Sequence, residues 1–222
     1  MLESAAALFD VGALLVVIAG TVIATAARSG WRNLRAALFA LARLRIAPID
    51  CDANRAALAR TIAAVRAKGH LCSDVPLPPD KAFASLVSGY LVSGSIEAMH
   101  EAAIKHQTAR ETGRDRAVRV LEYAGEIAPV FGLVGTLFAI SQLAPTGQLS
   151  LAENTMQALA TAVLSSLYGV LTAHIVYIPL AGAIERRGLR EEEDRLALIE
   201  WFEHELSREP PRGALSRVKD AA

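Results

Sequence analysis

Two long stretches of this sequence, residues 1–27 and residues 125–184, contain neither lysine nor arginine. All 23 basic residues therefore lie in 28–124 or 185–222. A soluble protein spreads these side chains along its whole surface, so the segregation argues against one. Hydrophobic residues make up 53% of the chain and charged residues 21%, which fits membrane segments joined by polar ones. The formal net charge is zero, and we expect no nucleic-acid partner.

Three apolar stretches occupy these gaps, at roughly 7–27, 126–144 and 155–184. Each reaches or exceeds the roughly 20 residues that cross about 30 Å of hydrocarbon. The first has no basic residues before it and arginines after it, so we interpret it as an anchor and not a signal peptide. The sequence therefore predicts an all-α, polytopic membrane protein with three transmembrane helices and a cytoplasmic helical domain.

Arginines set the predicted orientation. They cluster directly after the first span, and basic residues favour the cytoplasmic side. The N-terminus is then outside, and the link 145–154, which has no basic residue, is also outside. Four segments follow: a first span in 1–27, a cytoplasmic domain in 28–124, a helix pair in 125–184 and a cytoplasmic C-terminal helix and tail in 185–222.

The cytoplasmic segments have helical periodicity and no strand pattern. Helices are predicted at 55–69 and at 81–94, where Gly94 ends the second. Because no proline occurs between Ser95 and Pro129, residues 95–144 are predicted to form one helix of about 75 Å. The tail is predicted to be a helix that stops at Pro210, with Glu191 and Arg195 as an i,i+4 pair.

The chain has only two cysteines, Cys51 and Cys72, both in the predicted cytoplasmic segment. They are expected to be reduced thiols and not a disulfide. Two cysteines alone do not make a metal site, and we predict no metal and no cofactor.

Small and hydroxyl residues are concentrated in the second and third spans. Small residues let membrane helices approach closely. Hydroxyls there have two interpretations: they bond their own backbone, or they line a wet path between helices. Pro129 and Pro179 each remove a backbone hydrogen bond at about the same depth, which suggests a hinge layer. The candidate channel-face residues are Gly132, Gly135, Thr136, Thr161, Ser165 and Ser166.

The motifs "IAPVFGLVGTLFAI" and "ALATAVLSSLYGVLTAHIVYIPLAGAIERR" resemble the paired final spans of the MotA/TolQ/ExbB proton-channel family, and "LYG…IPLA" resembles its flagellar stator (MotA-like) branch. The resemblance implies that Pro129 and Pro179 couple ion passage to movement. It places Thr136 and Ser166 near the ion path. It also makes Arg66 and Asp74 rotor-facing charges, although a solvated helix surface is the alternative for that pair.

The same resemblance implies a homo-oligomer in the bacterial inner membrane, with five subunits around two copies of a single-span, MotB-like partner. The partner supplies the membrane aspartate, which fits a chain whose only mid-span titrating group near neutral pH is His174. His174 is either such a group or a packing residue, and Glu126 is a candidate for the ion exit. MotA-like proteins have four spans and this chain resembles them from the second, so it is either a three-span variant or has a start assigned too late.

Three alternatives differ in class. A serine hydrolase using Ser166 and His174 is disfavoured, because eight residues of one helix separate them by about 12 Å and a nucleophile needs its base at about 3 Å. We therefore predict no enzyme. An ExbB/TolQ-like energiser of outer-membrane work and a non-conducting scaffold stay open. The favoured prediction is a stator subunit that converts a proton or sodium gradient into torque on the flagellar rotor ring.

Overall fold

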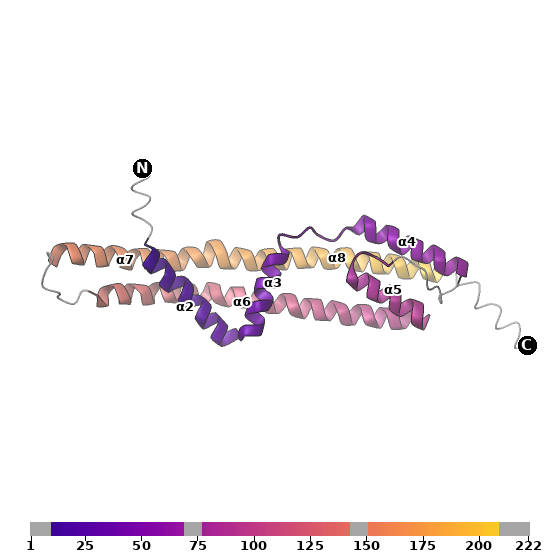
Figure 1. The fold of residues 1–222 in the computed structure, drawn as a ribbon, viewed down its shortest axis with the longest axis horizontal. Helices are drawn as coiled ribbons and strands as arrows, with labels where there is room; N and C mark the ends of the chain where they lie inside the picture. Colours follow the sequence, from indigo (N-terminus) through magenta and orange to yellow (C-terminus); the bar gives the residue numbers. More distant parts are fainter. Residues whose placement is uncertain (1–9, 69–76, 143–150, 209–222) are drawn as a thin grey trace, which may run out of the picture. The chain divides into compact units, whose positions relative to one another are not determined.

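The computed structural model describes residues 10–68, 77–142 and 151–208, and its elements within these ranges are all helical. The predicted all-α class is thus confirmed. Three helices are long and apolar enough to cross a membrane, as the sequence predicts. In chain order the elements are α2 (Val11–Ser29), α3 (Trp31–Arg43), α4 (Cys51–Lys68), α5 (Lys81–Ser93), α6 (Ile96–Ser141), α7 (Leu151–Leu171), the π-helical segment η1 (Thr172–Tyr177) and α8 (Ile178–Arg208) (Figure 1).

The chain divides into two compact units. We name Met1–Arg45 with Gly113–Arg186 the span unit, and Ile46–Thr112 with Arg187–Ala222 the helical unit. Helices α6 and α8 each contribute to both. The span unit thus includes residues 28–45 and 113–124, which belong to the cytoplasmic segment in the sequence-based division.

In the span unit, α2 buries one face. Its buried residues recur every fourth position, which places them on one side of a helix. Ala13 and Val17 pack there with Tyr168 of α7. At the start of α2, the carboxylate of Asp10 accepts the backbone N–H of Ala13 at 3.1 Å and the Thr161 hydroxyl at 2.9 Å. Asp10 therefore caps α2 and fastens it to α7. The buried α2 residues are Ala13, Val17, Thr21 and Thr25.

The helical unit has its own core, drawn from α4, α5, α6 and α8. Tyr90 and Phe202 meet edge to face within it, with ring centroids 6.3 Å apart. Asp80 caps α5, and Gly94 ends it with φ 65°, in the left-handed region that glycine adopts without strain. The predicted end at Gly94 is therefore confirmed. The buried members of the core are Leu58, Ile62, Val65, Phe83, Leu86, Val87, Tyr90, Met99, Ala103, Leu198, Ile199, Phe202 and Leu206.

Candidate functional site

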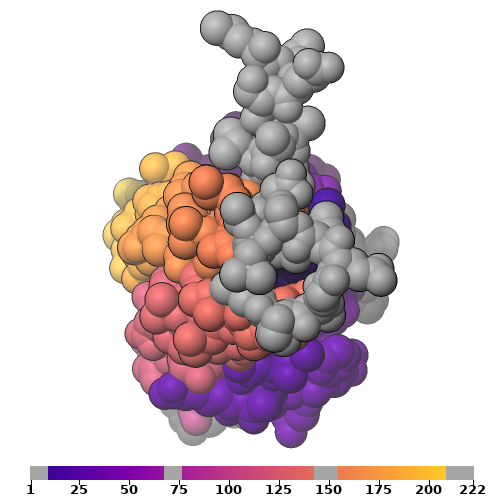
Figure 2. Space-filling model, turned by 90° about the vertical axis from the view of Figure 1, so that its left-hand side faces the viewer, coloured from indigo at the N-terminus to yellow at the C-terminus, as the bar shows by residue number. Residues whose placement is uncertain are grey.

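Helices α6 and α7 touch through their backbones. A Cβ built on Gly169 would lie 2.8 Å from the carbonyl oxygen of Ala128 and 3.0 Å from the Cα of Gly132. A Cβ built on Gly132 would lie 3.0 Å from the carbonyl oxygen of Ser165. Any larger residue would separate the helices, so the small-residue pattern here serves close packing. Figure 2 shows the two helices, orange and salmon, directly against each other.

Ser165 joins the two helices by a hydrogen bond. Its side chain is fully buried, and its hydroxyl donates to the carbonyl oxygen of Gly132 at 3.0 Å. A Cβ on Gly135 would collide with the Ser165 hydroxyl, so this bond also requires glycine at 135. The Ser165 hydroxyl thus makes a hydrogen bond from α7 to α6. The sequence had left open whether such hydroxyls bond the backbone of their own helix or line a wet path.

The other candidate hydroxyls lie elsewhere. Thr136 is half-buried and donates to the carbonyl oxygen of Leu133 at 2.6 Å, within its own helix. Thr161 faces α2, where its hydroxyl is bonded to Asp10. Ser166 is half-buried. The structure therefore brings Gly132, Gly135 and Ser165 together, whereas the Thr161 hydroxyl bonds Asp10 at the start of α2.

A π-helical segment precedes Pro179. In a regular α-helix the N–H of residue 179 would bond the carbonyl of residue 175, and proline has no N–H to give. The wide η1 turns, Thr172–Tyr177, lie where the hydrogen-bond register must change. The sequence predicted a loosened helix at this proline, but the π form was not predictable from proline alone.

The two prolines lie about one helical turn apart along the helix pair. A Cβ on Gly169 would lie 3.1 Å from the Cα of Pro129, and a Cβ on Gly125 would lie 3.1 Å from the Ile178 side chain. Pro179 is therefore near the level of Gly125, which is four residues, about 6 Å, from Pro129. Pro129 is half-buried against α7, whereas Pro179 is exposed.

Two ionisable candidates, Glu126 and His174, lie at the surface of the described chain. Helices α6 and α7 and the η1 segment expose many apolar side chains, which lipid or other subunits must cover in a membrane protein. The most exposed of these are Leu133, Leu137, Phe138, Met156, Leu159, Val163 and Ile175.

Arg66, one of the two predicted rotor-facing charges, bonds α8 of its own unit. Its guanidinium donates to the backbone carbonyl of Glu205 at 2.9 Å and to the Glu205 carboxylate at 3.1 Å. The Arg66 side chain is 36% exposed. Asp74, its predicted companion, lies outside the described residues.

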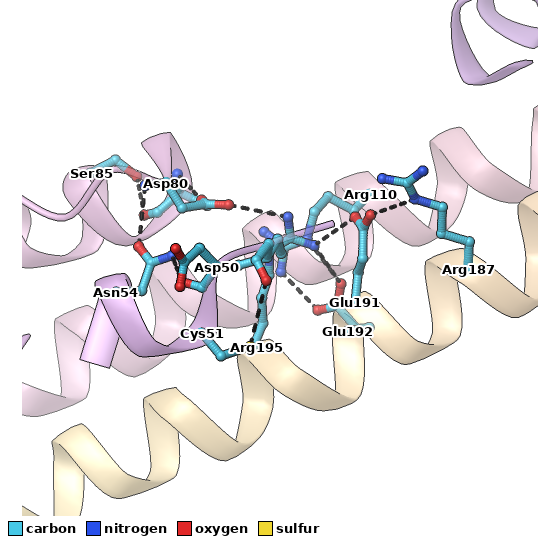
Figure 3. Close-up of polar contacts among 12 residues, drawn as sticks. Asp50, Cys51, Asn54, Asp80, Ser85, Arg110, Arg187, Glu191, Glu192 and Arg195 are labelled. Atoms are coloured by element: carbon cyan, nitrogen blue, oxygen red, sulfur yellow. Dashed lines mark hydrogen bonds and ion pairs between the residues drawn. The ribbon is translucent and has the colours of Figure 1, made fainter. Parts of the chain in front are cut away.

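A charged network crosses the helical unit around Arg195 (Figure 3). The Arg195 side chain is 7% exposed and donates to Asp80 at 3.3 Å. It also lies 3.8 Å from Glu191, the predicted i,i+4 partner, and 3.9 Å from Glu192. Arg110 of α6 binds Glu192 with two hydrogen bonds of 3.0 and 2.7 Å. The network therefore links α6, α8 and the start of α5. No short sequence pattern predicted the long-range pairs Arg195–Asp80 and Arg110–Glu192.

Cys51 begins α4 as a free thiol, as the sequence predicts, and Cys72 lies outside the described residues. Burial raises the pKa of the Cys51 thiol, and the carboxylates of Asp194 and Asp52 raise it further. Because the thiolate is the reactive form, a higher pKa leaves less of it at a given pH.

We expect Cys51, in a Cys72→Ser background, to react with iodoacetamide at pH 8 more slowly than glutathione. Asp194→Asn should lower the pKa of Cys51 and speed the reaction a few-fold, since one pKa unit changes the thiolate fraction about tenfold. Glu193→Gln, at an exposed neighbouring position, is the control. Equal rates in the two variants would contradict the expectation.

Comparison with known proteins gives the family. The model described as the MotA/TolQ/ExbB proton channel family matches residues 77–196. "Uncharacterized protein YtxD" of Bacillus subtilis (strain 168) is 30% identical over 110 residues, which are 50% of this chain and 40% of that protein. The match thus spans less than half of that relative's length.

Two solved structures share the fold. The structure of Campylobacter jejuni MotAB matches with a TM-score of 0.77 at 15% identity, over 96% of this chain and 84% of that chain. The flagellar MotAB stator complex from Bacillus subtilis matches with a TM-score of 0.74 at 19% identity, over 97% and 89%. With three apolar helices and a family match across more than half its length, this chain is a multi-pass membrane protein and belongs to the MotA/TolQ/ExbB proton channel family.

Proposed function

We propose that this chain is a stator-type ion-channel subunit that, with a MotB-like single-span partner, converts an ion gradient into mechanical work. The pairing of α6 and α7 carries the proposal. Their backbones are in contact, and two prolines and a π segment flank this contact. Residues 127–141 and 155–184 contain no carboxylate. A proton path through a membrane needs an ionisable group. Since the only such candidate here that titrates near neutral pH is His174, the partner supplies the carboxylate.

In this mechanism the rigid and the adjustable parts of the helix pair have different roles. Gly132, Ser165 and Gly169 keep α6 and α7 together as one body. The π segment and Pro179 form the adjustable point, because π turns and prolines leave carbonyls without regular helical partners. Protonation of the partner's aspartate changes the bend of the helix at the π segment and Pro179. This change in bend turns the ring of subunits. Thr136 and Ser166, both half-buried, are the hydroxyls proposed for the ion path.

The proposed setting is the bacterial inner membrane, with the start of α2 outside and the helical unit in the cytoplasm. The arginines that follow α2 support this orientation. The helical unit transmits the force to its target, for which the flagellar rotor is the favoured choice. Contact of Arg66 with a rotor carboxylate would replace its bond to Glu205.

Pro179→Leu is expected to leave assembly intact and to abolish ion-driven work. Leucine restores an N–H at position 179, which favours a regular α-helix over the π register of η1. The measurement is motility or proton flux of the variant complex beside its amount in membranes. Pro48→Leu, at an exposed position outside the helices, is the matched control. Normal motility and flux in Pro179→Leu would refute the proposed coupling role.

Purification from native membranes tests the function as a whole. We expect a single-span protein with a membrane aspartate and a peptidoglycan-binding domain, at two copies to five of this chain. A TolR-like or ExbD-like partner would instead assign the chain to outer-membrane energisation. A ring without any partner would leave no proton carrier and would make the scaffold interpretation correct.

A further inference from the structure

The chain carries positive charge without acidic compensation just after its first span. Between Asp10 and Asp50 the sequence has no aspartate or glutamate. The basic residues of this interval are Arg28, Arg32, Arg35, Arg43 and Arg45. Arg28 lies over the ring of Tyr123, with its guanidinium carbon 4.0 Å from the ring centroid. Arg32 and Arg35, both exposed, form no ion pair with any residue that the structure describes.

Helix α3 has two apolar faces, and only one of them is covered. Ala37 is buried against Ala117 and Val120 of α6 within the span unit. The other face exposes large side chains: Trp31 is 66% exposed, Leu38 57% and Phe39 65%. Trp31 and Leu38 are seven residues apart and thus on one side of the helix, with Arg35 beside them. The unpaired arginines and the exposed apolar stripe therefore share a surface.

The position of this surface follows from the turn before it. Helix α2 ends at Ser29, and Gly30, with φ 79°, turns the chain so that α3 begins at the next residue. Positive φ is strained for other residues, so glycine favours this turn. A helix that starts two residues after a membrane span starts at the membrane boundary. The exposed residues of the last part of α2, such as Ile23 at 68%, continue the apolar surface toward α3.

We propose that α3 is a lipid-binding helix, in which Arg32 and Arg35 bind the phosphates of anionic phospholipid headgroups while Trp31, Leu38 and Phe39 enter the acyl boundary. Guanidinium groups pair with phosphate in a bidentate manner, and tryptophan favours the membrane interface. A two-fold contact with a second copy of the chain fits this face less well, because it would bring the same unpaired arginines against each other. The anionic leaflet supplies both the countercharge and the apolar contact.

Fluorescence quenching of Trp31 tests the proposal. The chain has two tryptophans, so Trp201→Phe leaves Trp31 as the only emitter. The full chain is reconstituted in vesicles of constant phosphatidylcholine and phosphatidylglycerol content, with bromine on the acyl chains of one lipid or the other. We expect brominated phosphatidylglycerol to quench more strongly per mole than brominated phosphatidylcholine. One arginine near an anionic surface is worth about a five-fold preference, so the pair Arg32→Gln and Arg35→Gln should remove most of the selectivity.

The control pair, Arg60→Gln and Arg190→Gln, removes the same charge from exposed positions of the helical unit and should leave the selectivity unchanged. Equal quenching by the two brominated lipids in the unmutated helix would overturn the proposal, as would selectivity that survives the α3 substitutions. Absence of quenching by either lipid would show that another protein surface covers α3, and would also overturn it. None of these outcomes depends on ion passage, so the proposed channel function is tested separately.

Discussion

Gly169→Val is expected to prevent stable packing of α6 against α7. Even its Cβ would lie 2.8 Å from the Ala128 carbonyl oxygen and 3.1 Å from the Cα of Pro129, and these are backbone atoms that cannot rotate away. Overpacking of a tight core costs about 1–3 kcal/mol, and we expect the upper end because backbone limits relaxation. The measurement is the temperature at which half of the detergent-extracted protein loses its monodisperse elution.

Gly113→Val is the matched control. Gly113 lies in the interior of α6 as Gly169 lies in α7, but it is exposed, and a Cβ there would meet nothing within 4 Å. The two substitutions make the same chemical change in a helix, so helix propensity cancels between them. We expect Gly113→Val to stay close to the unmutated chain. If both variants lost stability equally, the proposed backbone contact at Gly169 would not limit the packing of the spans.

Arg195→Met should destabilise the helical unit by about 3–5 kcal/mol, the usual result of removing one partner of a buried ion pair. The Arg195 side chain is 7% exposed, and its carboxylate neighbours Asp80 and Glu192 are 17% and 9% exposed. Without the guanidinium, Asp80 would lose its ion-pair partner, whereas Glu192 would keep its two hydrogen bonds to Arg110. Urea unfolding followed by Trp201 fluorescence, in a Trp31→Phe background, measures the loss in this unit.

Two companion variants separate the ion pair from other causes. Arg190→Met removes an arginine from an exposed position of α8 and should change the free energy of unfolding little. Asp80→Asn added to Arg195→Met removes one unpaired carboxylate, while the asparagine oxygen can still accept the Ala82 N–H that caps α5 at 2.7 Å. Partial recovery in the double variant is the expected result. No recovery would mean that Asp80 is not the uncompensated charge.

Gly169→Val and Arg195→Met test two different parts of the proposed mechanism. The α6–α7 contact concerns the helix pair past which ions are proposed to move. The Arg195 network concerns the helical unit that is proposed to pass force on. A buried ion-pair network and a close backbone contact both limit internal deformation, because each has geometry that small displacements disrupt. Rigid units are suited to transmitting motion from a flexible point, which we propose to be the π segment before Pro179.

The sequence by itself determined the helical class, the three spans and the ends of α5. It did not give the start of α4 at Cys51, and the tail helix that it predicted after the third span is part of α8, which begins within that span at Ile178. Long apolar stretches without basic residues have few alternatives to membrane helices, since every backbone group must be satisfied internally. Local signals also located the end of α5 at Gly94 and the single long helix α6. The family resemblance, carried by the motifs of the last two spans, was confirmed by the match over residues 77–196.

Only the tertiary structure decided how the polar side chains pair. The sequence grouped Thr161 with Ser165 on one candidate face, yet Thr161 bonds Asp10 and Ser165 bonds Gly132. The resemblance made Arg66 a rotor-facing charge. In the structure Arg66 is hydrogen-bonded to Glu205, which is 139 residues away in the sequence. Periodicity gives the direction in which a side chain leaves its own helix, but a long-range hydrogen bond depends on the distance and rotation of a second helix, which packing alone sets.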